Sequence, residues 1–449
     1  MWNSWETAMR LPDWCEALEA LDAVAPPALG GASPQRLEGR LCEVGATLLR
    51  AHLPGVGLGE LCTLPSGEPA EVIAIQGDEA LLSPYREPLG MTAGQWVAPT
   101  GRRADVGVGD ALLGRVVDAL GRPIDGRPAP VLERRREIDA EPPDPMQRAP
   151  IAERLPMGVR AIDAALTVGV GQRLGIFAPA GCGKSTLLGM LAAGSDADVV
   201  VLALIGERGR EVREFLEHVL SAETRARSVV VVATSDRPAL ERLKAAATAT
   251  AVAEHFRDQG KKVLLLVDSL TRYARAVREI ALAAGEPIVA GGYPPSLYAR
   301  LPRLLERAGP AARGSITAFY TVLVDDKADA LAEEVRSLLD GHIVLARKLA
   351  EANHYPAIDV LASISRVMHQ VAAPAHRDAA ARLRQLMAAW REIELLVRVG
   401  EYRAGQDADA DDAIARRAQI DALLRQRLDE QVGFDATRAA LGDTVGLPC

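Results

Sequence analysis

The segment that most constrains this chain is residues 178–185, whose sequence is APAGCGKS. An apolar run typical of a buried strand, residues 174–177, precedes it, and a run typical of a helix begins at Thr186. A glycine-rich loop in that position lets backbone N–H groups and the positive end of a helix surround phosphate groups. The first position holds Ala178 where such loops usually have glycine. The prediction of this loop therefore also depends on the strand before it and the helix after it. The pattern predicts a phosphate-binding loop for a nucleoside triphosphate.

Residues of this loop have separate expected roles. Gly181 and Gly183 let the backbone close around the phosphates, Lys184 reaches the β- and γ-phosphates, and Ser185 holds Mg²⁺. ATP and Mg²⁺ are therefore the expected ligands. The alternative is an ordinary glycine-rich turn, which the strand before it and the helix after it disfavour. The residues expected to contact nucleotide in this loop are Ala178, Pro179, Ala180, Gly181, Cys182, Gly183, Lys184, Ser185 and Thr186.

A second apolar run, residues 263–267, ends at Asp268. In a parallel sheet the carboxyl ends of the strands meet at one edge, so this carboxylate is expected beside the phosphate-binding loop, where it can help to hold Mg²⁺. An aspartate after several aliphatic residues is by itself a weak signal. Its occurrence together with Lys184 makes the signal strong.

A third apolar run, residues 199–205, is followed by the charged residues 206–211, GERGRE. ATP hydrolysis requires a group that orients a water molecule opposite the leaving phosphate, and Glu207 lies where such a carboxylate would project. Arg208 is expected to contact the γ-phosphate. The alternative is the charged first turn of a helix, where glutamate is favoured by the helix dipole. We favour the catalytic interpretation for both residues, together with Lys184.

Length, composition and charge limit the class of protein. With 449 residues the chain is long enough for two or three domains. The longest apolar runs are far shorter than the roughly 18 residues of a membrane helix, and residues 1–6 do not resemble a signal peptide. Five cysteines without paired spacing fit a reducing compartment. We therefore expect a cytoplasmic protein, and its net charge of −8 argues against nucleic-acid binding.

The order of patterns along the chain predicts several folded parts. Short strands separated by turn signals predict a small β-barrel, and the proline-rich residues 141–150 predict a linker. Apolar strands that alternate with helices, among them a helix over residues 238–259, then predict a parallel sheet covered by helices. The expected boundaries are 1–36 for an N-terminal docking segment, 37–138 for the barrel, 139–150 for the linker, 151–370 for the α/β core and 371–449 for a helical C-terminal domain.

Both ends of the chain have amphipathic patterns. Trp2, Trp5 and Met9 have helical spacing and predict a surface that docks onto a partner protein, because the acidic residues around them disfavour an anionic bilayer. The acidic residues 407–412 lack the glycine and glutamate of a calcium loop, so they predict the first turn of a helix. In the C-terminal domain, apolar residues recur on one face of a predicted helix: Leu383, Leu386, Met387, Trp390, Ile393 and Val397.

Longer stretches of the sequence carry a family resemblance. They are residues 206–211, 114–123 (GRVVDALGRP), 155–168 (LPMGVRAIDAALTV), 292–296 (GYPPS), 334–350 (EVRSLLDGHIVLARKLA) and 354–368 (HYPAIDVLASISRVM). Together they resemble the rotary ATPase family and, within it, the ATPases of type III protein secretion. The resemblance covers about residues 37–430. It implies a RecA-like P-loop core with a parallel sheet, preceded by a small β-barrel and followed by a helical C-terminal domain.

The resemblance also implies how subunits cooperate. It implies a homohexamer with nucleotide at the subunit interfaces, in which Arg366 is an arginine finger for the neighbouring subunit and Tyr355 packs near adenine. Because one chain carries both Glu207 and Arg366, each interface of a homohexamer is expected to be active. The alternatives are a surface arginine at position 366 and a simple packing role for Tyr355.

The implied function is that of an ATP-hydrolysing motor of the non-flagellar type III secretion apparatus, which releases chaperones from effector proteins and unfolds the effectors for export. The implied partners are central-stalk and peripheral regulator proteins and chaperone–effector complexes, and these partners hold the ring at the cytoplasmic face of the inner membrane. The alternatives are a flagellar export ATPase, an RNA-acting ring helicase and a non-hydrolysing regulatory subunit. Residues 285–292, in a segment thought to face the central pore, and residues 324–331 depart from the family pattern.

Overall fold

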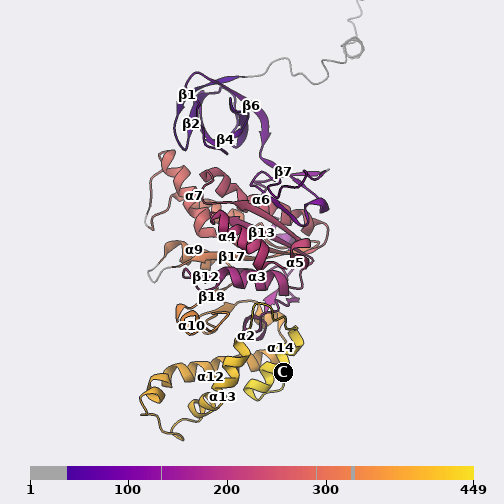
Figure 1. Cartoon of the computed structure of the whole chain (residues 1–449), viewed down its shortest axis with the longest axis vertical. Coiled ribbons are helices and arrows are strands. Elements are labelled where there is room, and N and C mark those ends of the chain that lie inside the picture. The colour runs from indigo at the N-terminus through magenta and orange to yellow at the C-terminus, as the bar shows by residue number, and fades with distance from the viewer. Residues whose placement is uncertain (1–37, 133, 290, 325–328) are drawn as a thin grey trace, which may run out of the picture.

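A closed six-stranded barrel lies at one end of the molecule (Figure 1). The computed structural model describes residues 38–132, 134–289, 291–324 and 329–449. The barrel strands pair in the order β1-β2-β5-β4-β3-β6, and β6 pairs again with β1. Their inward-facing residues, such as Leu41, Leu49 and Val97, form a separate hydrophobic core. The strands are β1 (Gly39–Val44), β2 (Leu49–His52), β3 (Glu60–Thr63), β4 (Pro69–Gln76), β5 (Glu79–Pro84) and β6 (Trp96–Arg103).

The closed barrel is shorter than the range 37–138 that the sequence predicts for it. β7 (Asp105–Val108) pairs with β9 (Arg134–Glu137) outside the barrel, and β8 (Arg115–Val117) pairs with β14 (Ser228–Ala233) in the next sheet. A closed barrel has no free edge, so further strands find backbone partners elsewhere. The other domain boundaries stay predictions, and the predicted docking segment 1–36 lies outside the described residues.

The middle layer of the molecule is a nine-stranded, mostly parallel sheet in the order β19-β18-β12-β17-β15-β13-β14-β8, with β16 attached to β17. Alternate residues of each strand point to opposite faces, so Val201 and Ala203 belong to one hydrophobic core while Val200 and Leu202 belong to another. Because both faces are buried, the middle of the sheet is apolar, and β13 is apolar along its whole length. Besides β8 and β14, the strands are β12 (Arg173–Ala178), β13 (Val199–Ile205), β15 (Lys262–Asp268), β16 (Gly309–Pro310), β17 (Ser315–Leu323), β18 (Gly341–Val344) and β19 (Ile364–Ser365).

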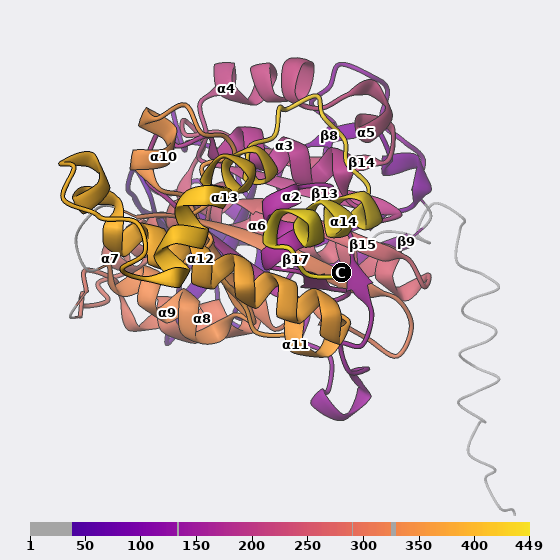
Figure 2. The ribbon, with the colours of Figure 1, turned by 90° about the horizontal axis from the view of Figure 1, so that it is seen from below.

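Helices cover both faces of this sheet (Figures 1 and 2). One face packs against α6 (Ala239–Asp258), α7 (Leu270–Ala283) and α8 (Pro295–Leu305), and the other against α3 (Lys184–Gly194). The prediction of a helix over 238–259 is confirmed, with Gly260 at φ 88° after its last turn. The remaining elements of the core are β10 (Arg154–Leu155), β11 (Val168–Gly169), α2 (Arg160–Ala165), α4 (Gly209–Glu214), α5 (Ala222–Ala226), α9 (Ala330–Leu338), α10 (Arg347–Glu351), α11 (Met368–Val371), η1 (Asp110–Leu112), η2 (Pro145–Gln147) and η3 (Phe215–Val219).

Three helices form the C-terminal end of the molecule (Figure 1): α12 (Pro374–Arg398), α13 (Ala408–Leu424) and α14 (Phe434–Val445). Leu383 and Leu386 of the predicted apolar face are fully buried, whereas Leu395 near the end of α12 is 69% exposed. The predicted acidic helix start is confirmed, because the Asp407 carboxylate accepts hydrogen bonds from the first backbone N–H groups of α13. Within the described residues, no helix is long and apolar enough to cross a membrane.

Candidate active site

The phosphate-binding loop leaves the carboxyl end of β12 and enters α3, as the sequence predicts. Gly181 and Gly183 have φ values of 79° and 80°, a left-handed conformation that glycine adopts without strain. Gly183 is the residue immediately before α3, so the free N–H groups of the first helical turn face the space enclosed by the loop. The loop therefore has the backbone conformation that surrounds a phosphate group.

Three of the predicted residues meet beside this loop. The Nζ atom of Lys184 lies 3.4 Å from Oε1 of Glu207 and also contacts Oδ1 of Asp268. Glu207 follows β13 and Asp268 ends β15, and these two strands are neighbours in the sheet. Asp268 is 3% exposed, and its carboxylate also accepts a 2.7 Å hydrogen bond from the hydroxyl group of Thr321 on β17. The sheet thus gathers one cation and two carboxylates at one edge.

The environment of Glu207 favours the protonated form of its carboxyl group. Burial raises the pKa of Glu207 above its ordinary value, Lys184 opposes this shift, and the Asp268 carboxylate adds to it. A carboxylate with a raised pKa is a stronger base than an exposed one. The site therefore combines a cation for phosphate oxygens with a basic carboxylate at short range.

Three other predicted residues, Arg208, Ser185 and Cys182, make no hydrogen bond or ion pair with the side chains of Lys184, Glu207 and Asp268 in the described residues. The Arg208 side chain is 78% exposed and pairs with Glu211 at 2.8 Å rather than pointing to Lys184. Ser185 lies exposed in the first turn of α3, next to the partly buried Thr186. Cys182 is buried, and that burial raises the pKa of its thiol, which makes it a poor nucleophile.

Tyr355 lies against the other side of the loop. A Cβ atom placed on Gly183 would lie 3.2 Å from the Tyr355 ring, which is a tight contact, so glycine leaves room for the ring to approach the loop. The ring borders a cavity of about 480 Å³, and the C-terminal domain forms part of the cavity wall with residues that include Arg425 and Gln426. The backbone N–H of Gln426 donates a 2.9 Å hydrogen bond to the carbonyl oxygen of Tyr355.

The sequence did not indicate that Arg425 and Gln426 line the cavity beside Tyr355, or that Thr321 holds the Asp268 carboxylate. Gln426 is 5% exposed, and its side chain joins three segments by accepting from the N–H of Arg160 and donating to the carbonyl oxygens of Gly158 and Glu430. No motif in the sequence marks these residues. Only the packing of the C-terminal domain on α2 brings them to the cavity.

Arg366 lies at the opposite edge of the sheet from the phosphate-binding loop. Its backbone N–H donates to the carbonyl oxygen of Asp340, and the backbone N–H of Asp340 donates to that of Arg173, the first residue of β12. Ala178, where the loop begins, is the last residue of that strand. At about 3.3 Å per residue, it lies about 16 Å from Arg173. Arg366 is exposed, and its guanidinium group donates one 3.3 Å hydrogen bond to the carbonyl oxygen of Arg336. A single exposed bond of this kind can be exchanged for a contact with a neighbouring subunit.

A glycine-rich loop on a parallel sheet, with a lysine and two carboxylates at its carboxyl edge, defines a P-loop nucleoside triphosphatase. Residues 158–365 match the model of the ATP synthase alpha/beta family, nucleotide-binding domain, and residues 372–443 match that of the T3SS EscN ATPase C-terminal domain.

Relatives with the same architecture make this assignment more specific. The SPI-2 type 3 secretion system ATPase of Salmonella typhimurium is 59% identical over 88% of this chain and 92% of its own length. The flagellum-specific ATP synthase of Treponema pallidum is 48% identical over 94% of this chain and 96% of its own length. The assembled ATPase EscN from the enteropathogenic E. coli type III secretion system matches with a TM-score of 0.87 and 53% identity, over 91% of this chain and 100% of that one. The chain belongs to the type 3 secretion system ATPases and hydrolyses ATP.

Proposed function

We propose that this chain works as a closed homohexamer in which each ATP lies between two neighbours, bound by the phosphate-binding loop of one subunit and reached by Arg366 of the next. The observation that carries this proposal is the placement of Arg366 at the sheet edge opposite Ala178. A side chain there does not reach the phosphates of its own subunit. Identical subunits that follow one another around a ring bring the two edges together at every interface.

The chemistry at each interface follows from the groups beside the loop. Lys184 exchanges its contacts with Glu207 and Asp268 for phosphate oxygens, and Glu207 then orients and polarises the attacking water. Arg208 turns from Glu211 to the γ-phosphate, and Arg366 of the neighbour stabilises the charge that develops there. Tyr355 packs near the adenine, in the cavity beside Gly183.

The oxygen atoms of Ser185 and Asp268 fit Mg²⁺, because a hydroxyl group and a carboxylate are ligands that this cation prefers. Asp268 is buried and already accepts from Thr321, which holds its carboxylate in place. Bound Mg²⁺ would supply neutralisation of charge on the phosphate oxygens.

In the cell, we infer that the ring works in the cytoplasm at the face of the inner membrane, where it releases chaperones and unfolds effector proteins for export. Its EscN relative has been solved as an assembled ATPase and in a complex with its central stalk EscO. By analogy we assign this chain a central-stalk partner and peripheral regulators of the export apparatus.

Flagellar export is the second candidate function. The identities favour non-flagellar secretion, because the type 3 secretion ATPases of Salmonella and of Xanthomonas euvesicatoria reach 59% and 54%, against 48% for the flagellar relative of Treponema. An RNA-acting helicase is disfavoured by the net charge of −8.

The dependence of ATPase activity on protein concentration tests the proposal. If the reaction centre is shared between subunits, the specific activity rises with concentration and follows the mass measured by light scattering. Full specific activity in a sample that sediments as a single subunit would contradict the shared centre.

A further inference from the structure

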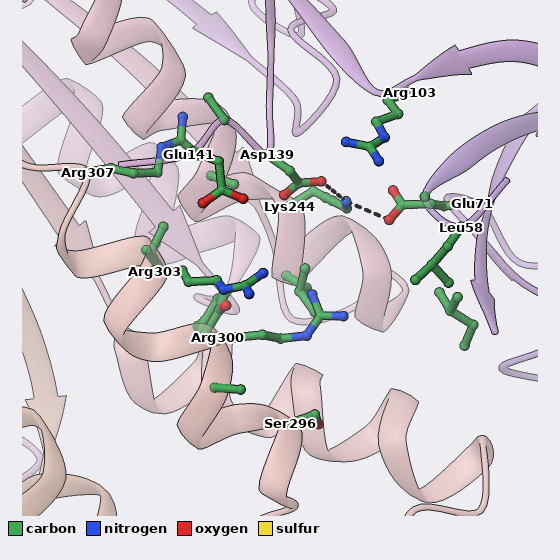
Figure 3. A pocket seen from close by; sticks show the side chains of 18 of the residues that line it. Leu58, Glu71, Arg103, Asp139, Glu141, Lys244, Ser296, Arg300, Arg303 and Arg307 are labelled. Atoms are coloured by element: carbon green, nitrogen blue, oxygen red, sulfur yellow. Dashed lines mark hydrogen bonds and ion pairs between the residues drawn. The ribbon is translucent and has the colours of Figure 1, made fainter. Parts of the chain in front are cut away.

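A second cavity, of about 430 Å³, lies where the barrel meets the core (Figure 3). We call it the barrel–core cavity. Its walls come from the barrel strands β4 and β6, from residues 139–141, and from α6, α7 and α8. It shares no lining residue with the cavity beside Tyr355. None of the residues discussed for ATP hydrolysis therefore belongs to it.

A buried ion-pair network holds the two sides of the barrel–core cavity together. Lys244 of α6 is 1% exposed, and its Nζ atom lies 2.7 Å from Oε1 of Glu71 on β4 and contacts the Asp139 carboxylate. The hydroxyl group of Tyr85 donates to the second oxygen of Glu71 at 3.2 Å. The charge of Lys244 is thus neutralised inside the protein, and the barrel wall is fixed relative to the core wall.

Three arginines at the rim of the cavity have no such partners among the residues that the structure describes. Figure 3 shows Arg103 from the barrel side and Arg300 and Arg303 from α8 extending toward the same space, without an ion pair or hydrogen bond to any residue drawn. Arg307, one turn further along, is by contrast held by both carboxylate oxygens of Glu254 at 2.9 Å. Guanidinium groups that share one space repel each other unless an anion lies between them.

The charge balance of the lining residues leaves a positive excess at the rim. Asp139 is committed to Lys244: burial alone would raise the pKa of Asp139, but Lys244, with Arg300 and Arg307, holds it below its ordinary value. Glu71 is committed to Lys244 and Tyr85. Glu141 is the remaining carboxylate of the lining, which holds five cationic side chains against three carboxylates. The guanidinium groups of the rim are therefore in excess and can bind an external anion.

The inner wall of the cavity is apolar. Leu243 and Ala247 of α6 and the ring of Tyr273 are all at least nine-tenths buried and line its inner wall. Ligand sites for small molecules commonly have volumes of about 300–1,000 Å³ and combine such a wall with a few charged groups. A bare inorganic ion would leave this apolar wall unused.

We propose that the barrel–core cavity binds a small organic phosphate, with the phosphate between Arg103, Arg300 and Arg303 and the organic part against Leu243, Ala247 and Tyr273. The planar, five-donor guanidinium group matches phosphate oxygens in a paired arrangement that lysine does not offer. A ligand in this position contacts β6 and α8 at once. It therefore stabilises the arrangement of the barrel on the core.

Calorimetric titration of the full-length protein with phenyl phosphate tests the site. We expect saturable binding to the wild type, binding at least tenfold weaker in Arg103→Gln and in the double variant Arg300→Gln/Arg303→Gln, and unchanged binding in Arg102→Gln and Arg313→Gln. Arg102 and Arg313 are exposed arginines outside the cavity lining and serve as matched controls. Inorganic phosphate is expected to bind at least tenfold more weakly than phenyl phosphate, and equal affinities would contradict the role of the apolar wall.

Lys184→Ala separates this site from the phosphate-binding loop. Phenyl phosphate binding that survives Lys184→Ala and is lost in the double variant supports the proposal, and the reverse pattern overturns it. Absence of saturable binding to the wild type also overturns it. If, in that case, Arg300→Gln/Arg303→Gln weakens subunit assembly in sedimentation experiments, the arginines contact acidic groups of a second copy instead. Thermal unfolding and ATPase activity close to the wild type show that the variant is folded.

Discussion

The ammonium nitrogen of Lys184 lies 3.4 Å from Oε1 of Glu207, and the same ammonium group contacts Asp268. The residue proposed to bind phosphate thus holds the carboxylate that is proposed to orient water. A triphosphate that attracts Lys184 removes a cation from beside Glu207. Binding of substrate and release of the catalytic carboxylate are therefore coupled through one side chain.

Replacement of Glu207 by glutamine keeps the shape of the side chain and removes its basicity. We expect the turnover number of Glu207→Gln to fall by about 10²–10⁴, the usual contribution of a general base, while ATP still binds. Steady-state ATPase assays and nucleotide titrations measure the two effects. Glu214→Gln, on the exposed face of α4, is the matched control and is expected to keep wild-type turnover.

Glu207→Gln is also expected to remove a pH dependence of the ATPase rate. Glu207 acts only when ionised, so activity is lost as the pH falls through its pKa, and burial places that pKa above the ordinary range of glutamate. The acid limb of the wild-type rate profile is expected at correspondingly high pH and is absent from the residual activity of Glu207→Gln. An identical acid limb in both proteins would assign the titration to another group.

Mixing two inactive variants tests whether the reaction centre is shared. Arg366→Ala is expected to lower turnover by about 10³–10⁵, as for other arginine fingers supplied by a neighbour. In rings assembled from equal amounts of Arg366→Ala and Glu207→Gln, about a quarter of the interfaces combine an intact Glu207 with an intact Arg366 of the neighbour.

Activity should therefore reappear on mixing, measured after dissociation and reassembly of the subunits. Mixtures that stay as inactive as either parent would place Arg366 and Glu207 in independent roles. A mixture of two Glu207→Gln preparations is the control and gains nothing.

Tyr355 offers a test of the base-binding cavity. Tyr355→Ala removes the ring beside Gly183 and is expected to raise the KM for ATP about tenfold, or about 1.4 kcal/mol, with a smaller effect on turnover. Tyr355→Phe keeps the ring and should behave like the wild type, because no hydrogen bond of the Tyr355 hydroxyl group occurs among the described residues. Equal KM values for the alanine and phenylalanine variants would leave Tyr355 with a packing role only.

The buried carboxyl group of Asp163 is expected to make the free energy of unfolding depend on pH. Its carboxylate is 1% exposed and accepts 2.9 Å hydrogen bonds from the N–H groups of Met157 and Gly158, and burial raises its pKa to about 7. The folded state therefore binds this proton more tightly than the unfolded state, so the contribution of Asp163 to the free energy of unfolding decreases as the pH rises toward 7.

Denaturant unfolding between pH 5 and pH 8 checks this sign. The stability of Asp163→Asn, relative to the wild type, is expected to improve with rising pH by at most about 1.4 kcal/mol per pH unit. The exposed Asp435 is a suitable control, because Asp435→Asn should leave the pH dependence unchanged. A constant difference between Asp163→Asn and the wild type would contradict the raised pKa.

The sequence alone determined the class of fold and the centre of the site. Its apolar runs end at turn signals, so the phosphate-binding loop, Glu207 and Asp268 could be placed at the ends of strands, and the structure brings all three to one sheet edge. The helix over 238–259 was equally predictable, because proline and glycine mark its ends locally. These features depend on residues that are close together in the chain.

Only the tertiary structure decided what depends on distant segments. β8 joins the core sheet rather than the barrel because β14 offers it a parallel partner, and Gln426 reaches Tyr355 because the C-terminal helices pack on α2. The tertiary structure likewise places Arg366 beside the start of β12, at the end of the strand away from the phosphate-binding loop. Local propensity carries no information about such pairings, since their free energy comes from surfaces that meet only after the chain has folded.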